Sequence, residues 1–281
     1  MIDWLIQPLT YGFMQRGMAA AVIVGIVCAV IGCYVVLRGM AFIGDALAHA
    51  ILPGVAISYL LGGNLLIGAL VAAIVVALGI GLFSRREVIK EDTAIGILFA
   101  AALALGVALI SSIRTYAVDL SHILFGDILG VSPGDLLMIA ILSFVVIAAI
   151  LVLYRPFLVI SFDPVLASTL RMPAELLRNL MLILLATTVV VSLQTVGIGL
   201  VAAMLITPAA TAYLLARRLP SMMALAAAIG AFSSIIGLYL SYYLNVASGS
   251  AIVLVATAFF VLAFLFAPRR GWVWQLARQQ E

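Results

Sequence analysis

The sequence contains very little charge. Only 9% of its 281 residues are Asp, Glu, Lys or Arg, and 67% are hydrophobic, whereas about a quarter of a soluble domain is charged. Apolar runs of about 20 residues recur along the chain, which is typical of a polytopic helical membrane protein. No stretch is polar enough to form a soluble domain. We therefore expect one all-α membrane domain that covers residues 1–281, embedded in lipid as a multi-pass protein of the cell membrane.

The chain also lacks the motifs of nucleotide-driven or hydrolytic enzymes. Lys90 is its only lysine, and no phosphate-binding loop of the form GxxxxGK[S/T] occurs. Nucleophile elbows, zinc-protease helices and paired metal-binding cysteines are also missing. We expect no catalytic residues, no permanently bound cofactor and no nucleic-acid partner. If ATP drives this protein, a separate subunit must hydrolyse it.

Cysteine is almost absent as well. Cys28 and Cys33 are the only two cysteines and lie five residues apart in one apolar run. On a helix this spacing points them in different directions, so they cannot form a disulfide with each other. We expect both to be structural thiols.

The apolar runs predict about eight to nine transmembrane helices. A lead-in at residues 1–13 carries aromatic residues that suit the membrane interface. The sixth run is short, and Gln194 to Gly199 separates it from the seventh; merging the two would give eight spans instead of nine. Pro208 is expected to bend the seventh span, with Thr207 and Thr211 helping to satisfy freed backbone groups. The expected spans are 14–37, 45–61, 65–83, 93–112, 134–154, 180–193, 200–216, 221–244 and 250–267.

The placement of Lys and Arg predicts the orientation of these spans. With nine spans and an external N-terminus, all of the 14 basic residues except Arg16 and Arg114 fall on one side of the membrane. The side richer in Lys and Arg is normally the cytoplasm. The polar stretch at about 155–178 falls on that side. Its apolar positions fit one face of a short amphipathic helix.

The most informative stretch is GDALAHAILPG at residues 44–54, which places an acid and an imidazole inside an apolar run. Asp45 and His49 are four residues apart, so on a helix they share one face. Pro53 and Gly54 allow that helix to break or bend just beyond the pair. A carboxylate near the middle of a bilayer costs roughly 2.5–3.5 kcal/mol even on the lenient insertion scale, so it normally serves a function. One oxygen and one nitrogen ligand at this spacing suit a divalent transition metal.

Two side chains do not complete a metal site, because a transition metal takes four to six donors. Backbone carbonyls near Pro53, water, or the same pair from a second copy could supply the others. A structural interpretation also stands, in which Asp45 and His49 form an ion pair that only holds the bundle together. A second polar group, Asp119, His122 and Asp127, could receive an ion on the outer face or could be ordinary loop chemistry.

Several motifs in order along the chain resemble the permease subunit of bacterial ATP-binding-cassette importers for manganese, zinc or iron. The resemblance covers essentially the whole chain. Besides residues 44–54, it rests on FMQR at 13–16, VLRGM at 36–40, EDTAIG at 91–96, LFGDIL at 124–129, VGIGLV at 196–201 and LITPAATA at 205–212.

The resemblance implies a function and a set of partners. Members of that family work as two permease copies with two ATPase subunits and an extracytoplasmic metal-binding protein. By the resemblance, Asp45 and His49 take the family's metal-gating position. Its cytoplasmic coupling helix, which contacts the ATPase, corresponds to Asp163, Pro164, Val165, Leu166 and Ala167.

The expected function is therefore ATP-driven import of a divalent metal by alternating access, with manganese first and zinc or iron as alternatives. Three other interpretations remain open. An ion-coupled secondary carrier would use the same acid and imidazole without an ATPase. An importer of a chelated metal or a vitamin would share the architecture but need no direct ligand from Asp45 or His49. A passive membrane scaffold would need neither.

Overall fold

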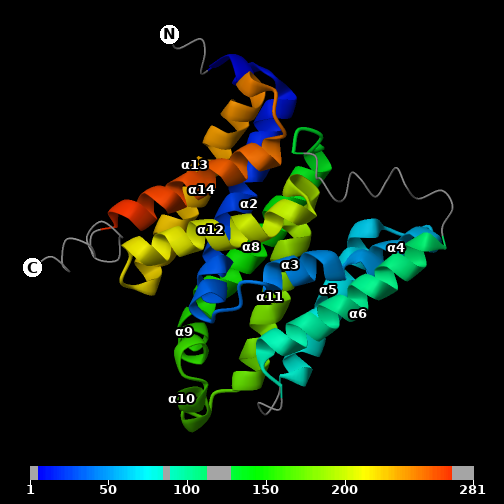
Figure 1. The fold of residues 1–281 in the computed structure, drawn as a ribbon, viewed down its shortest axis with the longest axis vertical. Helices are drawn as coiled ribbons and strands as arrows, with labels where there is room; N and C mark the ends of the chain where they lie inside the picture. The colour runs from blue at the N-terminus through cyan, green and yellow to red at the C-terminus, as the bar shows by residue number, and fades with distance from the viewer. Residues whose placement is uncertain (1–5, 85–88, 113–127, 268–281) are drawn as a thin grey trace, which may run out of the picture.

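The chain folds into a bundle of helices (Figure 1). The computed structural model describes residues 6–84, 89–112 and 128–267, and within them it contains helices and no strands. The elements are η1 (Gln7–Thr10), α2 (Gly12–Leu37), α3 (Ile43–Ala50), α4 (Leu52–Leu60), α5 (Leu65–Phe83), α6 (Glu91–Ser111), α8 (Pro133–Val152), α9 (Tyr154–Phe162), α10 (Pro164–Thr169), α11 (Ala174–Val196), α12 (Ile198–Leu215), α13 (Leu219–Leu244) and α14 (Ser248–Phe266).

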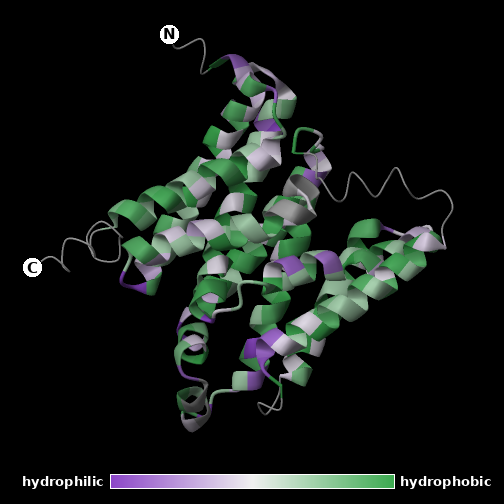
Figure 2. Cartoon of the chain, in the orientation of Figure 1, coloured by the Kyte–Doolittle hydropathy of each residue, from purple (hydrophilic) through white to green (hydrophobic). Residues whose placement is uncertain are grey.

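Eight helical segments within the described residues are long and apolar enough to cross a membrane, and a shorter apolar helix covers Val201–Leu215. One of the eight, Ile43–Leu60, combines α3 and α4. Figure 2 shows apolar residues along the helices and hydrophilic residues mainly at helix ends, with α3 as an exception. The predicted all-α membrane fold with about eight to nine spans is confirmed.

The sixth span differs from its prediction. Helix α11 runs over Ala174–Val196, well beyond the short span expected at 180–193. Its polar first turns, with Glu175 and Arg178, continue the helix past the apolar stretch, because hydropathy marks the lipid-facing length and not the helical length. The expected six-residue interruption before α12 reduces to Gly197, whose φ of 79° is readily adopted only by glycine.

Helix α2 forms the centre of the bundle, with α4, α5 and α6 on one side and α13 and α14 on the other (Figure 1). It crosses α13 so closely that a Cβ on Gly25 would collide with the carbonyl oxygen of Gly230. Small residues at helix crossings are a common packing device in membranes. Ser234 secures the same crossing by donating a hydrogen bond to the carbonyl oxygen of Ala21, at 2.9 Å.

The two cysteines are both free and buried, as expected for structural thiols. The Cys28 sulfur lies 2.9 Å from the Ser192 hydroxyl oxygen. Pro208 lies inside α12, and the Thr211 hydroxyl donates to the Thr207 carbonyl oxygen at 2.7 Å. This is an ordinary bond from a threonine side chain to the carbonyl four residues earlier. The carbonyl that Pro208 would leave free is that of Met204, so both the compensation and a bend at Pro208 stay predictions.

Contacts between helix ends place Arg38 and Arg178 at the same end of the bundle. The C-terminal ends of α2 and α5 meet the N-terminal ends of α6 and α11 through these two residues. Arg16, one of the two basic residues expected on the other side, lies near the N-terminus of α2 and donates to the Val131 carbonyl oxygen at 3.1 Å. Arg16 and Arg38 thus lie at opposite ends of α2, while the end that faces the cytoplasm stays a prediction.

Candidate metal site and coupling region

Asp45 and His49 lie one turn apart on α3, as their spacing predicts. The His49 Nε2 atom is 3.7 Å from the nearer Asp45 carboxylate oxygen. This is an ion-pair distance and is too long for a good hydrogen bond. The His49 side chain is 30% exposed and the Asp45 side chain is 49% exposed, so both remain accessible from outside the chain. The structure therefore brings the predicted pair together without sealing it.

The rest of α3 anchors this pair. Leu47 and Ala48 are completely buried, and α3 packs mainly against α6 and α12. The His49 ring lies 5.9 Å from the Phe99 ring of α6, measured between ring centroids. Phe42, just before the helix begins, is 78% exposed. Asp45 and His49 thus lie where the chain's own helices cover α3 only in part.

The expected helix break lies directly beyond the pair. Helix α3 ends at Ala50, and α4 begins at Leu52 with Pro53 in its first turn. Proline suits that position because the first turn of a helix has no partner for its N–H groups. The break shortens α3 to eight residues, so Asp45 lies in its first turn and His49 in its last.

Within the described residues, no group of three or more His, Cys, Asp or Glu side chains is placed to hold a metal ion. One copy of the chain thus contributes Asp45 and His49 as two donors, fewer than a transition metal takes. The second predicted group, Asp119, His122 and Asp127, lies outside the described residues.

The predicted coupling helix exists as α10, six residues long. The Asp163 carboxylate accepts a hydrogen bond from the Leu166 backbone N–H at 2.9 Å, which caps the start of the helix. The Ala167 side chain is completely buried, whereas Leu166 is 46% exposed. Pro164 and Val165 form its first turn. Figure 1 shows α9 and α10 together at one end of the molecule, away from the N-terminal end of α2.

A family model described as the ABC 3 transport family matches residues 10–267. The chain belongs to the ABC 3 transport family. The permease is 51% identical over 265 residues to the manganese transport system membrane protein MntC of Halalkalibacterium halodurans, in an alignment covering 94% of this chain and 91% of that protein.

Two further comparisons extend this result. A Haemophilus influenzae membrane protein, whose name assigns it to an iron transport system, is 42% identical over 270 residues, covering 96% of this chain and 99% of that protein. The solved structure of PsaBC from Streptococcus pneumoniae in complex with Fab is 40% identical, with a TM-score of 0.86 and 100% of both chains covered. This chain is thus a multi-pass membrane permease of an ABC transport system, and not its ATPase. Such a system implies an ATPase and a binding protein as partners.

The permease also contains a group of polar contacts that sequence reasoning missed. One Arg38 guanidinium nitrogen lies 2.8 Å and 3.2 Å from the two Glu91 carboxylate oxygens. The Arg178 guanidinium donates to the Gly81 carbonyl oxygen at 2.6 Å and to that of Ser84 at 3.3 Å. We call Arg38, Glu91 and Arg178 the polar clasp. Two sequence signals could have indicated these contacts: a basic residue that follows one helix, and an acidic residue in the first turn of another.

Burial affects the pKa of Arg38 within the polar clasp. The Arg38 and Glu91 side chains are only 11% and 21% exposed. Burial lowers the pKa of Arg38 below its usual range, Glu91 acts to raise it, and the Arg178 charge lowers it again. Glu91 thus acts on the Arg38 pKa in the opposite sense to burial and to the like charge of Arg178.

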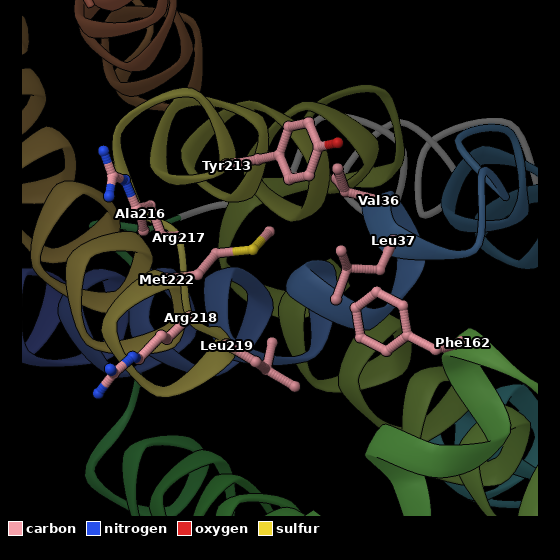
Figure 3. A pocket seen from close by; sticks show the side chains of 9 residues that line it. All are labelled: Val36, Leu37, Phe162, Tyr213, Ala216, Arg217, Arg218, Leu219 and Met222. Atoms are coloured by element: carbon pink, nitrogen blue, oxygen red, sulfur yellow. The ribbon is translucent and has the colours of Figure 1, made fainter. Parts of the chain in front are cut away.

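A cavity of about 290 Å³ lies at the ends of α2, α9, α12 and α13 (Figure 3). Val36, Leu37 and Phe162 form one side, and the guanidinium groups of Arg217 and Arg218 point away from them. Neither Asp45 nor His49 lines this cavity, so it is separate from the candidate metal site.

Proposed function

We propose that the permease carries divalent manganese into the cytoplasm by ATP-driven alternating access. The observation that carries this proposal is the partly exposed Asp45–His49 pair. It lies in an otherwise apolar candidate span, Ile43–Leu60, which is interrupted between α3 and α4. Ionisable side chains within a membrane normally face a wet pathway or a partner. Manganese is preferred because the manganese transport protein MntC is 51% identical over nearly the whole chain.

A second copy of the permease would complete the site. Two copies related by a two-fold axis would offer two carboxylates and two imidazoles, which reaches the four donors that a transition metal needs. The partial exposure of Asp45 and His49 supports this arrangement, because a lipid tail against their exposed atoms would leave the pair without polar neighbours. The ion would exchange part of its hydration shell for these ligands during passage.

The partners would act at opposite ends. A metal-binding protein outside the membrane would deliver the ion, and two ATPase subunits would bind at α10 through Asp163, Pro164, Val165, Leu166 and Ala167. The exposed Leu166 suits contact with such a subunit, while the buried Ala167 ties α10 to the bundle. ATP binding and hydrolysis would then switch the side to which the pathway opens.

Manganese uptake by vesicles that contain the permease and its ATPase tests the proposal. Asp45→Ala and His49→Ala should each abolish uptake while the purified complex keeps its size and subunit composition. Asp92→Asn is the matched control, because Asp92 is an exposed acid in the first turn of α6, outside α3, and should keep normal uptake. Normal uptake in both α3 variants would contradict a direct ligand role and favour a chelate as cargo.

Iron is the second candidate cargo, because the iron-system relative is 42% identical over almost the whole chain. Oxygen and nitrogen ligands suit both ions. Competition between the two metals in the same vesicles distinguishes them. Dissipating ion gradients tests the secondary-carrier alternative, since an ATP-driven importer should be insensitive to it.

A further inference from the structure

The connection between α10 and α11 is short and is closed by a backbone hydrogen bond. Only residues 170–173 separate the two helices. Arg171 adopts a left-handed conformation with φ of 55°, and the Met172 backbone N–H donates to the Ala167 carbonyl oxygen at 3.0 Å. This pattern closes the C-terminal end of α10 in the manner of a helix cap. A movement of α10 should therefore pass directly into α11.

Arg178 joins the start of α11 to the end of α5. Its two hydrogen bonds reach carbonyl oxygens in the last turn of α5, where a helix has acceptors without partners of its own. A positive charge is also favourable at that end of a helix. The helices touch closely here, because a Cβ on Gly81 would collide with the Asn179 side chain. Helices α5 and α11 are thus tied together at this end.

Arg38 and Glu91 make the corresponding tie between α2 and α6. Arg38 follows the last residue of α2, and Glu91 is the first residue of α6. Both Glu91 carboxylate oxygens lie within hydrogen-bond distance of Arg38. Charge-assisted contacts of this kind are stronger and more directional than neutral ones. The start of α6 is therefore held by the central helix.

Helix α6 leads from this end to the candidate metal site. Phe99 lies about two turns beyond Glu91 on α6 and contacts the His49 ring. Helix α3, which carries both Asp45 and His49, packs mainly against α6 and α12. A shift of α6 should therefore reposition the imidazole.

We propose that Arg38, Glu91 and Arg178 are the positioning residues that transmit movement of α10 to the Asp45–His49 pair. This inference rests on the proposed transport function. Arg178 holds α11 to α5, and the Arg38–Glu91 contact holds α2 to α6. The packing of α11 against α2 and of α5 against α6 connects these two ties. The four helix ends therefore move together, so the ATPase can act on α3 without touching it. Without the polar clasp, α10 and α11 can still respond to ATP, but α6 no longer follows.

The test measures ATP hydrolysis, manganese uptake and manganese binding separately in the full complex reconstituted in vesicles. Arg178→Gln and Glu91→Gln should keep hydrolysis and manganese binding but reduce uptake per ATP by at least about tenfold, within the usual range of coupling between sites. Arg178→Lys, which keeps the charge and a donor, should recover part of the coupling. Arg217→Gln and Asp92→Asn are matched controls with the same charge changes and should stay within about twofold of wild type.

Three results would overturn the inference. Unchanged uptake per ATP in Arg178→Gln and Glu91→Gln would show that the polar clasp transmits nothing. A parallel fall of hydrolysis and uptake, or loss of the assembled complex even in Arg178→Lys, would assign it a structural role only. Failure of the wild-type complex to bind or move manganese would instead contradict the proposed function, and so the two failures can be told apart.

Discussion

The Asp45–His49 pair and the Arg38–Glu91 contact of the polar clasp both place an acidic side chain beside a basic one, yet they differ in distance, burial and the helices that they join. The α3 pair is separated by 3.7 Å and is one-third to one-half exposed. The Arg38–Glu91 contact is 2.8 Å and mostly buried. The pair lies within one helix, whereas the polar clasp joins four helix ends. A site that must bind and release an ion benefits from weak internal pairing, whereas a mechanical link benefits from strong pairing.

The largest expected effect concerns the α3 pair and its proposed role in binding the ion. Asp45→Ala or His49→Ala should lower manganese uptake by about 30-fold or more, because loss of one close partner of a charged group typically costs about 2–5 kcal/mol. Radioactive manganese accumulation in vesicles measures it. The Asp92→Asn variant should accumulate manganese normally, and residual uptake above a tenth of wild type would argue against direct ligation.

Breaking the polar clasp should affect stability more than any change to the α3 pair. Glu91→Gln leaves the Arg38 charge mostly buried with no carboxylate, and we expect a loss of about 2 kcal/mol in the free energy of unfolding. Thermal unfolding of the purified permease measures this loss. A double variant, Arg38→Gln with Glu91→Gln, should be less destabilised than the sum of the singles, and strict additivity would contradict a direct interaction.

The cap of α10 gives a smaller effect. Asp163→Ala removes the acceptor of the Leu166 N–H and should cost about 1 kcal/mol locally, as other N-cap losses do. Hydrogen exchange of the α10 amides should increase while that of α2 stays unchanged. Asp163→Asn keeps an acceptor oxygen and should restore protection; equal exchange in both variants would contradict the capping role.

The smallest expected effect sharpens the contrast. Asp45→Asn should change the free energy of unfolding by no more than about 0.5 kcal/mol, because the carboxylate is half-exposed and makes no short contact. The same thermal unfolding assay applies. A loss as large as that of Glu91→Gln would favour the interpretation of Asp45 and His49 as a structural ion pair.

The sequence predicted the fold class and the α3 pair well, because both depend on local patterns. Hydropathy over about 20 residues marks a span, and a spacing of four places two side chains on one helical face. The length of α11 was underestimated at both ends. At its N-terminal end, the polar turns with Glu175 and Arg178 carry no hydropathy signal. The coupling helix at α10 was found through resemblance and confirmed as a helix, while its contact with an ATPase stays a prediction.

Composition and spacing alone determined that this chain is a helical membrane protein with one acid and one imidazole on a shared helix face. Only the tertiary structure decided that this face is left partly exposed, that Arg38 and Glu91 join α2 to α6, and that Arg178 joins α11 to α5. Arg38 and Glu91 are 53 residues apart, and Arg178 is 97 residues from Gly81. Contacts at such separations arise from how helices pack, and helix packing depends on the shapes of whole surfaces rather than on any local pattern.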